Sequence, residues 1–250
     1  MTQSPAIVSR EAWLEARRAL LAEEKAHTRA RDALAAKRRA LPWVKVEKDY
    51  RFEGPEGPLS LTDLFGAKRQ LIVYHFMLPP GADAGCIGCS FLSDHLDGII
   101  PHLQQKDVAF VAVSRAPADE IAAFRRRMGW SFRWVSSGGG DFNYDFNASF
   151  TPEQLAGAPA TYNFAPIRPP VADLPGISVF IRDDAGGIFH TYSQFARGGE
   201  DVLATYALLD LTPLGRQERD ADGQMASWVK LRDQYAPQTA AGCPACATAA

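Results

Sequence analysis

"GADAGCIGCSFLSDHLDG", residues 81–98, places Cys86 and Cys89 three positions apart. It follows "QLIVYHFML", residues 70–78, an apolar run without alternation, which is the pattern of a strand buried on both faces of a sheet. A helix is expected from about Cys89 to Gln104, and a proline inside this segment must kink it or end it early. The two cysteines therefore stand between a central strand and the start of a helix.

Strands and helices continue to alternate after this point. "DVAFVAVSR" predicts a second buried strand, and "APADEIAAFRRRMGW" predicts a helix that ends at Gly129. Strands joined through a helix lie parallel, whereas "GISVFIRDDAGGIFHTYS" predicts an antiparallel hairpin, so the sheet is expected to be mixed. Residues 136–175 break the rhythm and are interpreted as an insertion. Two short helices are expected at about residues 200–209 and 224–235.

The N-terminal segment differs from the rest of the chain. Residues 9–39 contain no Gly or Pro and are rich in strong helix formers, which predicts one long helix or a helix broken once. We therefore expect a helical arm at 1–41, a main domain at 42–236 and a C-terminal tail at 237–250 that contains "CPAC". The apolar side chains of the arm are expected to face the body or a second subunit, and they are Trp13, Leu20, Leu21 and Leu34.

Composition excludes several classes of protein. The formal charge is −2 and 46% of the residues are hydrophobic, which indicates a globular protein with a real core and disfavours binding to nucleic acid. The apolar runs are much shorter than the roughly 20 residues that a spanning helix needs. The N-terminus lacks the basic end and apolar block of a signal peptide, so we expect a cytoplasmic protein without membrane partners.

Cysteine usage indicates redox chemistry or metal binding. Four cysteines are too few for a disulfide-stapled secreted scaffold. Disulfide exchange needs one thiolate that attacks and a second thiol that resolves the mixed disulfide, and C-x-x-C at a helix start supplies both. The unpaired N–H groups there lower the thiol pKa of the first cysteine. Cys86 is therefore expected to be the nucleophile and Cys89 the resolving thiol.

A zinc site would give the same cysteines a structural role in place of redox chemistry. Cys86 and Cys89 would join Cys243 and Cys246 as four thiolate ligands of a tetrahedral ion. Zinc ribbons separate their two pairs by about 15 to 20 residues, far fewer than separate these pairs, although folding can close the gap. The tail dithiol is also interpreted as an electron donor to the first pair, or as an inert tail that binds metal incidentally.

The order of elements resembles the thioredoxin fold, in which a redox pair follows the first central strand. The stretches "YHFMLPPGADAGCIGCSFLSDHLDG", "LPWVKVEKDYRFEGPEG", "DFNYDF", "GISVFIRDDAGGIFHTYSQFARG" and "LDLTPLGRQE" resemble a bacterial thioredoxin-like family catalogued as a domain of unknown function. This resemblance covers residues 8–235. It implies an α/β thioredoxin-like fold, with a central mixed sheet flanked by helices and a long N-terminal helical extension.

The resemblance also implies an activity, because members of this family are described as predicted dithiol-disulfide oxidoreductases. The expected substrate is a disulfide in a protein or a small molecule, the expected reductant is a thioredoxin or glutathione system, and no organic cofactor is needed. Compared with thioredoxins, Gly85 replaces a Trp, and Ile87-Gly88 replaces Gly-Pro between the cysteines. Pro175 lies close to the place where thioredoxins keep a cis-proline.

The strand before the cysteines holds a candidate for proton transfer. Thioredoxins keep a buried carboxylate that accepts the proton of the resolving thiol, and either Tyr74 or His75 stands near that place. Adjacent strand residues face opposite sides, so only one of the two points toward the thiols. His75 is expected to be a proton relay or a hydrogen-bonded core histidine, and the same two roles are open to His190.

Thiol peroxidase activity is a second possible chemistry for Cys86, because peroxiredoxins share the thioredoxin fold. They place Pro, a hydroxyl residue and Cys at fixed spacing, and Pro79 is correctly placed relative to Cys86. Asp83 occupies the position of the hydroxyl, where its carboxylate would repel both the thiolate and the negative charge that develops on the leaving oxygen.

Overall fold

The computed structural model describes residues 5–218 and 228–235. The chain divides into two units, Met1–Trp43 and Val44–Ala250. The first unit contains α1, Arg10–Arg39, whose N-cap Ser9 accepts a hydrogen bond from the Ala12 N–H at 3.2 Å. None of the residues of α1 is buried, and Trp13 is 52% exposed. The long helix expected from the absence of Gly and Pro is confirmed.

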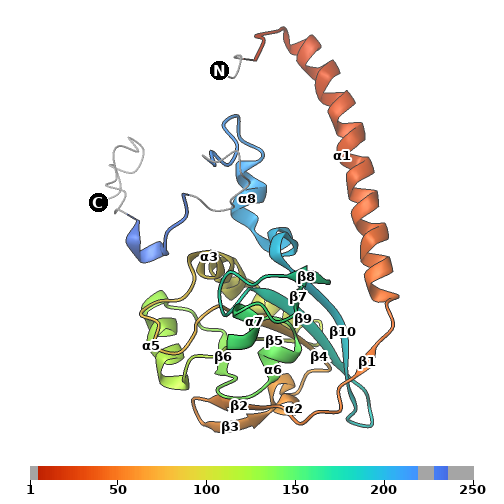
Figure 1. The fold of residues 1–250 in the computed structure, drawn as a ribbon. Helices are drawn as coiled ribbons and strands as arrows, with labels where there is room; N and C mark the ends of the chain where they lie inside the picture. Colours follow the sequence, from red (N-terminus) through yellow and green to blue (C-terminus); the bar gives the residue numbers. More distant parts are fainter. Residues whose placement is uncertain (1–4, 219–227, 236–250) are drawn as a thin grey trace, which may run out of the picture. The chain divides into compact units, whose positions relative to one another are not determined.

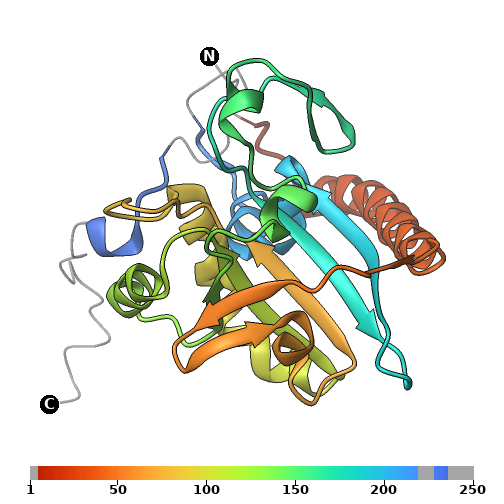
Figure 2. The same cartoon turned by 60° about the horizontal axis from the view of Figure 1, so that its bottom comes forward.

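The second unit is built on an eight-stranded sheet with the order β1-β10-β9-β4-β5-β6-β2-β3 (Figure 1). β4 runs parallel to β5, and β5 runs parallel to β6. On its other side β4 pairs antiparallel with β9, which forms the predicted hairpin with β10, drawn in cyan in Figure 2. The strands are β1 Val44–Lys45, β2 Arg51–Gly54, β3 Gly57–Ser60, β4 Gln70–His75, β5 Val108–Ser114, β6 Arg133–Ser136, β9 Gly176–Arg182 and β10 Ile188–Phe195.

Two hydrophobic clusters cover the two faces of this sheet. One face carries Tyr74, Phe76 and Trp134 and packs against α3, α5 and α8. The opposite face carries Leu71, Val73 and Phe180 and packs against α2 and α6. Alternating residues of β4 thus enter different cores, as the buried apolar run predicts. The helices are α2 Leu61–Phe65, α3 Ile87–Leu96, α4 Ile100–Gln104, α5 Ala118–Met128, α6 Phe142–Asp145, α7 Pro152–Leu155 and α8 Ala204–Leu209.

The core of the fold is the unit β4-α3-β5 followed by β9-β10-α8, with the strand order β5-β4-β9-β10. This arrangement is the thioredoxin-like fold, and the predicted fold class is confirmed. Between β6 and β9 the chain forms α6, α7 and a separate hairpin of β7, Ala160–Tyr162, and β8, Ala165–Ile167. Arg115, just after β5, binds Asp173 in this segment with N–O distances of 2.6 and 3.0 Å.

The helix expected from Cys89 to Gln104 is interrupted, as its proline predicts, but the interruption comes before Pro101. It is divided into α3, the 3-10 helix η1, Asp97–Ile99, and α4. Pro101 lies in the first turn of α4, where its missing N–H leaves no intrahelical bond unmade. The helix expected to begin near Glu200 is also divided, because the 3-10 helix η2, Ala196–Val202, precedes α8.

The last expected helix, 224–235, lies partly outside the described residues, and 228–235 contain only the 3-10 helix η3, Arg232–Gln234. The "CPAC" tail also lies outside them. Within the ranges that the structure describes, no helix combines the length and the apolar character needed to cross a membrane.

Candidate active site at Cys86 and Cys89

Cys86 is the N-cap residue of α3, and its Sγ accepts a hydrogen bond from the Cys89 N–H at 3.5 Å. Hydrogen bonds fix both the N–H and the carbonyl group of Cys86. Its N–H donates to the Met77 carbonyl at 3.1 Å, and its own carbonyl accepts from the Ser90 hydroxyl at 2.9 Å. The predicted placement of the first cysteine at a helix start is therefore observed. The Cys86 sulfur lies where the unpaired N–H groups of the helix favour negative charge.

Gly85, at the position of the thioredoxin tryptophan, has no room for a side chain. A Cβ atom at residue 85 would lie 2.5 Å from Cε1 of Phe76 and 2.7 Å from Cε1 of Phe124. Both rings are buried, so neither can move aside without disturbing the core. Only glycine fits directly before Cys86.

The two thiols differ in burial and in acidity. Hydrogen bonds from the Cys89 thiol, and then from the Cys89 and Gly88 N–H groups, outweigh burial and lower the pKa of Cys86 to about 6. Cys89 is 2% exposed, and burial followed by the interaction with Cys86 raises its pKa well above its ordinary value. At neutral pH the site therefore holds a Cys86 thiolate beside a protonated Cys89.

Tyr74, and not His75, lies on the face of the sheet that carries the thiols. Tyr74 and Cys89 belong to the same buried cluster, and a hydrogen bond with Tyr74 opposes the rise in the Cys89 pKa. The His75 ring stacks on Phe142 in the opposite core, with ring centroids 5.5 Å apart. Its two ring nitrogens lie within hydrogen-bond distance of Asn143 and Ser178, so in this structure His75 is a hydrogen-bonded core histidine, and its role in proton transfer stays a prediction.

A pocket of ≈ 120 Å³ opens beside the thiols. Residues from the end of β4, the first turns of α3, the start of β9 and the segment after β10 line it. Pro175 is among them, in a chain whose described residues contain no cis peptide bond. Apart from Tyr74 and the thiols, Gln194 is the polar side chain of the pocket, and the remainder of the lining is apolar, including Leu92, Ile177, Phe195 and Leu203.

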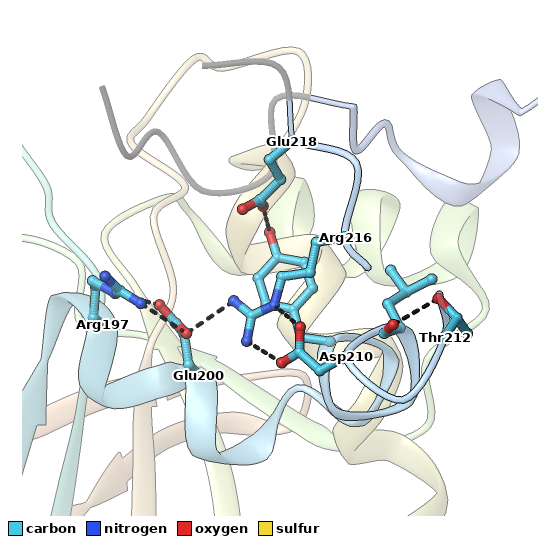
Figure 3. A network of polar contacts seen from close by, with 8 residues as sticks. Arg197, Glu200, Asp210, Thr212, Arg216 and Glu218 are labelled. Atoms are coloured by element: carbon cyan, nitrogen blue, oxygen red, sulfur yellow. Dashed lines mark hydrogen bonds and ion pairs between the residues drawn. The ribbon is translucent and has the colours of Figure 1, made fainter. Parts of the chain in front are cut away.

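Part of this lining is held in place by an ion-pair network (Figure 3). Gly199 and Leu203, in and directly after η2, line the pocket, and Glu200 lies between them. The Glu200 carboxylate accepts hydrogen bonds from Arg197 at 2.5 Å and from Arg216 at 3.1 Å. Arg216 also binds Asp210 through two nitrogens and covers the Tyr206 ring. Charged groups thus support the pocket from outside without entering it.

The zinc and peroxidase alternatives involve further residues near Cys86 and in the C-terminal tail. No group of three or more His, Cys, Asp or Glu side chains that could hold a metal ion occurs among them, and Cys243 and Cys246 lie outside that part of the chain. Asp83, at the peroxiredoxin hydroxyl position, is exposed and makes none of the hydrogen bonds to Cys86. The residues from β9 to α8 that line the pocket carry no local motif, so sequence reasoning missed them.

Comparisons with known proteins identify the family and give distant structural neighbours. No curated protein matches this sequence. Peroxidoxin BcpB from Mycobacterium tuberculosis is 13% identical, with 66% of this chain and 95% of that chain covered and a TM-score of 0.43. Peroxiredoxin Q from Xanthomonas campestris is also 13% identical. The match covers 66% of this chain and 95% of that chain, with a TM-score of 0.45.

A Bacteroides thetaiotaomicron protein, provisionally assigned as a protein disulfide isomerase, is 13% identical; the match covers 67% of this chain and 91% of that one, with a TM-score of 0.37. The model of the family described as "Bacterial protein of unknown function (DUF899)" matches residues 2–235. The chain therefore belongs to the DUF899 family of bacterial proteins.

Proposed function

We propose that the protein is a thiol–disulfide oxidoreductase in which Cys86 attacks and Cys89 resolves. The observation that carries this proposal is the difference between the two thiols. Cys86 caps α3 with a pKa of about 6 and lines a pocket, while Cys89 lies buried behind it with a raised pKa. Two cysteines that only filled space in the core would need neither the helix-cap position nor the difference between the two thiol pKa values.

The reaction proceeds in two exchanges. The Cys86 thiolate attacks one sulfur of a substrate disulfide, the substrate S–S bond breaks, and the other substrate sulfur leaves as a thiolate that takes up a proton. Cys89 then loses its proton and attacks Cys86 Sγ, which releases the second substrate sulfur. The substrate gains two electrons, and Cys86 and Cys89 are left oxidised as a disulfide. A thioredoxin or glutathione system would return the two electrons.

The site also accounts for the timing of the second step. The negative Cys86 sulfur contributes to the raised pKa of Cys89. Once Cys86 is bound in a mixed disulfide this charge is gone, so Cys89 deprotonates more readily. The hydrogen bond with Tyr74, which lowers the pKa of Cys89, remains and stabilises the attacking thiolate.

The test is substrate trapping combined with redox titration. In a background with Cys243→Ser and Cys246→Ser, Cys89→Ser is expected to accumulate mixed disulfides through Cys86, and Cys86→Ser is expected to abolish exchange. Peptide-resolved alkylation across dithiol buffers should show Cys86 and Cys89 interconverting as a pair, within the roughly −120 to −270 mV of thioredoxin-fold oxidoreductases. A pair that stays reduced throughout, or two single variants of equal and full activity, contradicts the proposal.

A further inference from the structure

A second and larger pocket lies on the face of the sheet that carries His75. Its volume is ≈ 310 Å³, and it is lined by β1, the residues that follow it, the end of α6 and β10. His190 and Ser193 of β10 are its polar groups from the sheet. The thiol chemistry proposed above uses none of these residues.

A chain of hydrogen bonds runs from this pocket into the buried core. His190 Nε2 lies 2.7 Å from Ser193 Oγ, which lies 2.9 Å from Ser178 Oγ. Ser178 Oγ in turn lies 3.0 Å from His75 Nε2. At its end, His75 Nδ1 lies 2.9 Å from Asn143 Oδ1. Ser178, His75 and Asn143 are all at most 3% exposed, so these hydrogen bonds form a polar network buried inside an apolar core.

The donor and acceptor of every hydrogen bond in this series are fixed by the bonds at its two ends. His190 Nε2 also lies 3.0 Å from the Tyr192 carbonyl, which can only accept, so Nε2 carries the hydrogen. The Asn143 oxygen likewise requires hydrogen on His75 Nδ1, which leaves His75 Nε2 as an acceptor. Each serine hydroxyl then donates toward His75 and accepts from the His190 side.

Neutral His190 is therefore held in one tautomer, with the lone pair on Nδ1. No hydrogen bond to Nδ1 is found among the described residues, and this atom is not among their buried, unpartnered polar atoms. Because His190 lines the pocket, Nδ1 offers it a hydrogen-bond acceptor. Burial lowers the pKa of His190, which favours this neutral form.

Four aromatic side chains line the pocket, beside two valines, Asn147 and four charged residues. Phe146, Phe164, Phe195 and Tyr50 line it, and the Phe164 and Phe195 ring centroids are 5.6 Å apart. Asn163 and Phe164 form the two-residue turn of the β7–β8 hairpin, with φ +50° and +62°, as this type of tight turn requires. Phe164 is 75% exposed.

The charged groups of the pocket are already paired. Lys48 Nζ binds Asp141 at 2.6 Å and Asp145 at 2.8 Å, and the Tyr50 hydroxyl donates to Asp145. Lys45 is paired with Glu47 at 4.0 Å. Lys48 is thus held by two carboxylates, with which an anionic ligand would have to compete, whereas the exposed Lys45–Glu47 pair is weak. Aromatic side chains beside the Nδ1 acceptor of His190 fit an uncharged ring that carries a hydrogen-bond donor.

We propose that this pocket binds a small uncharged aromatic hydroxy compound, of the phenol class. Its ring packs against Phe146, Phe164 and Phe195, and its hydroxyl donates to His190 Nδ1. The hydrogen-bond chain behind His190 keeps this acceptor available, since rotation or tautomer exchange of the imidazole would leave buried hydroxyl groups unpaired.

The test is an NMR titration of the full-length protein with phenol and with anisole, its methyl ether, in the millimolar range. Phenol has the donor and anisole lacks it. We expect phenol to bind about tenfold more tightly and to shift the imidazole signals of His190, which His190→Gln identifies by their loss. Equal affinity for the two probes, no saturable binding, or shifts confined to the Cys86 pocket would each overturn the proposal.

Two exposed apolar residues provide a matched pair of variants. Phe164→Ala removes one aromatic wall and is expected to weaken phenol binding several-fold, whereas Leu155→Ala, on α7 and outside the pocket, is expected to leave it unchanged. Because Phe164 is exposed, its truncation leaves the core intact. Equal phenol affinity in both variants contradicts the proposed ring contacts.

Discussion

Cys86 and Cys89 are chemically alike in the sequence and unlike in the structure. The difference comes from the atoms around each sulfur, since Cys86 receives hydrogen bonds at the helix terminus and Cys89 is removed from water. Tyr74 and His75 differ in the same way, because alternation along β4 sends one ring toward the thiols and the other into the opposite core.

The pH dependence of alkylation tests the acidity of Cys86. Its reaction with iodoacetamide should follow the thiolate fraction, with a midpoint near pH 6. Cys89→Ala removes the largest contribution to the lowered pKa, so the midpoint should rise and the rate at pH 6 should fall roughly tenfold. Peptide mass spectrometry separates Cys86 from the other thiols. A midpoint that does not move in Cys89→Ala would refute the assigned cause.

The pH dependence of stability tests the environment of His75, whose pKa burial lowers to about 4. Between about pH 6.5 and pH 4 the unfolded chain binds a proton at this site that the folded protein does not bind. The contribution of His75 to the free energy of unfolding is therefore complete above pH 6.5. It declines by about 2 kcal/mol on going to pH 5.

Urea unfolding at pH 7 and pH 5 measures this decline. His75→Gln is expected to flatten the difference between the two pH values and to lower stability at pH 7 by about 1–3 kcal/mol, because Asn143 and Ser178 lose hydrogen-bond partners. If the variant keeps the full pH dependence, other groups are responsible for it.

At the scale of the elements, sequence pattern predicted those parts whose signal is local. The buried run of β4, the Gly129 end of α5 and the β9–β10 hairpin were all found where the residues placed them. An interruption of the helix that follows the cysteines was predicted from Pro101, but the structure places it earlier, at η1. Most of the lining of both pockets beyond Tyr74, the thiols, Pro175 and His190 was missed, since it joins strands and turns that are distant in sequence and meet only through sheet pairing.

Gly85 tests the approach of the chain to α3. Gly85→Ala forces a methyl group against Phe76 and Phe124, which should destabilise the protein by about 1–3 kcal/mol and slow alkylation of Cys86. Gly98→Ala is the control, because a Cβ atom at residue 98 meets nothing within 4 Å. Thermal unfolding of both variants makes the comparison. Equal losses at the two positions would show that the effect is not steric.

At the scale of the whole molecule, the segment between β6 and β9 is joined to the sheet by a buried ion pair. Arg115 and Asp173 have side chains 15% and 8% exposed, and Asp173 also accepts from the Ser149 hydroxyl at 2.6 Å. The ion pair therefore fixes the chain shortly before Pro175 and Gly176, which line the pocket beside the thiols.

Removing one partner of this ion pair should affect the molecule widely. Arg115→Met leaves the Asp173 carboxylate buried without its counter-charge, which is expected to cost about 3–5 kcal/mol and to speed proteolysis between residues 136 and 175. Adding Asp173→Asn removes the buried charge and should recover part of the loss. Urea unfolding and limited proteolysis measure both effects. A double variant no more stable than Arg115→Met would contradict this explanation.

The antiparallel pairing of β4 with β9 joins strands that leave the ribosome at different times. Leu71 pairs with Phe180, so the ribosome delivers β4, α3 and β5 many seconds before β9, at about 5 to 20 residues per second. During that interval the nascent chain carries both cysteines without the strand and turn that later enclose them. We therefore expect cellular oxidants and other thiols to reach these sulfurs more easily in the nascent chain than in the folded protein.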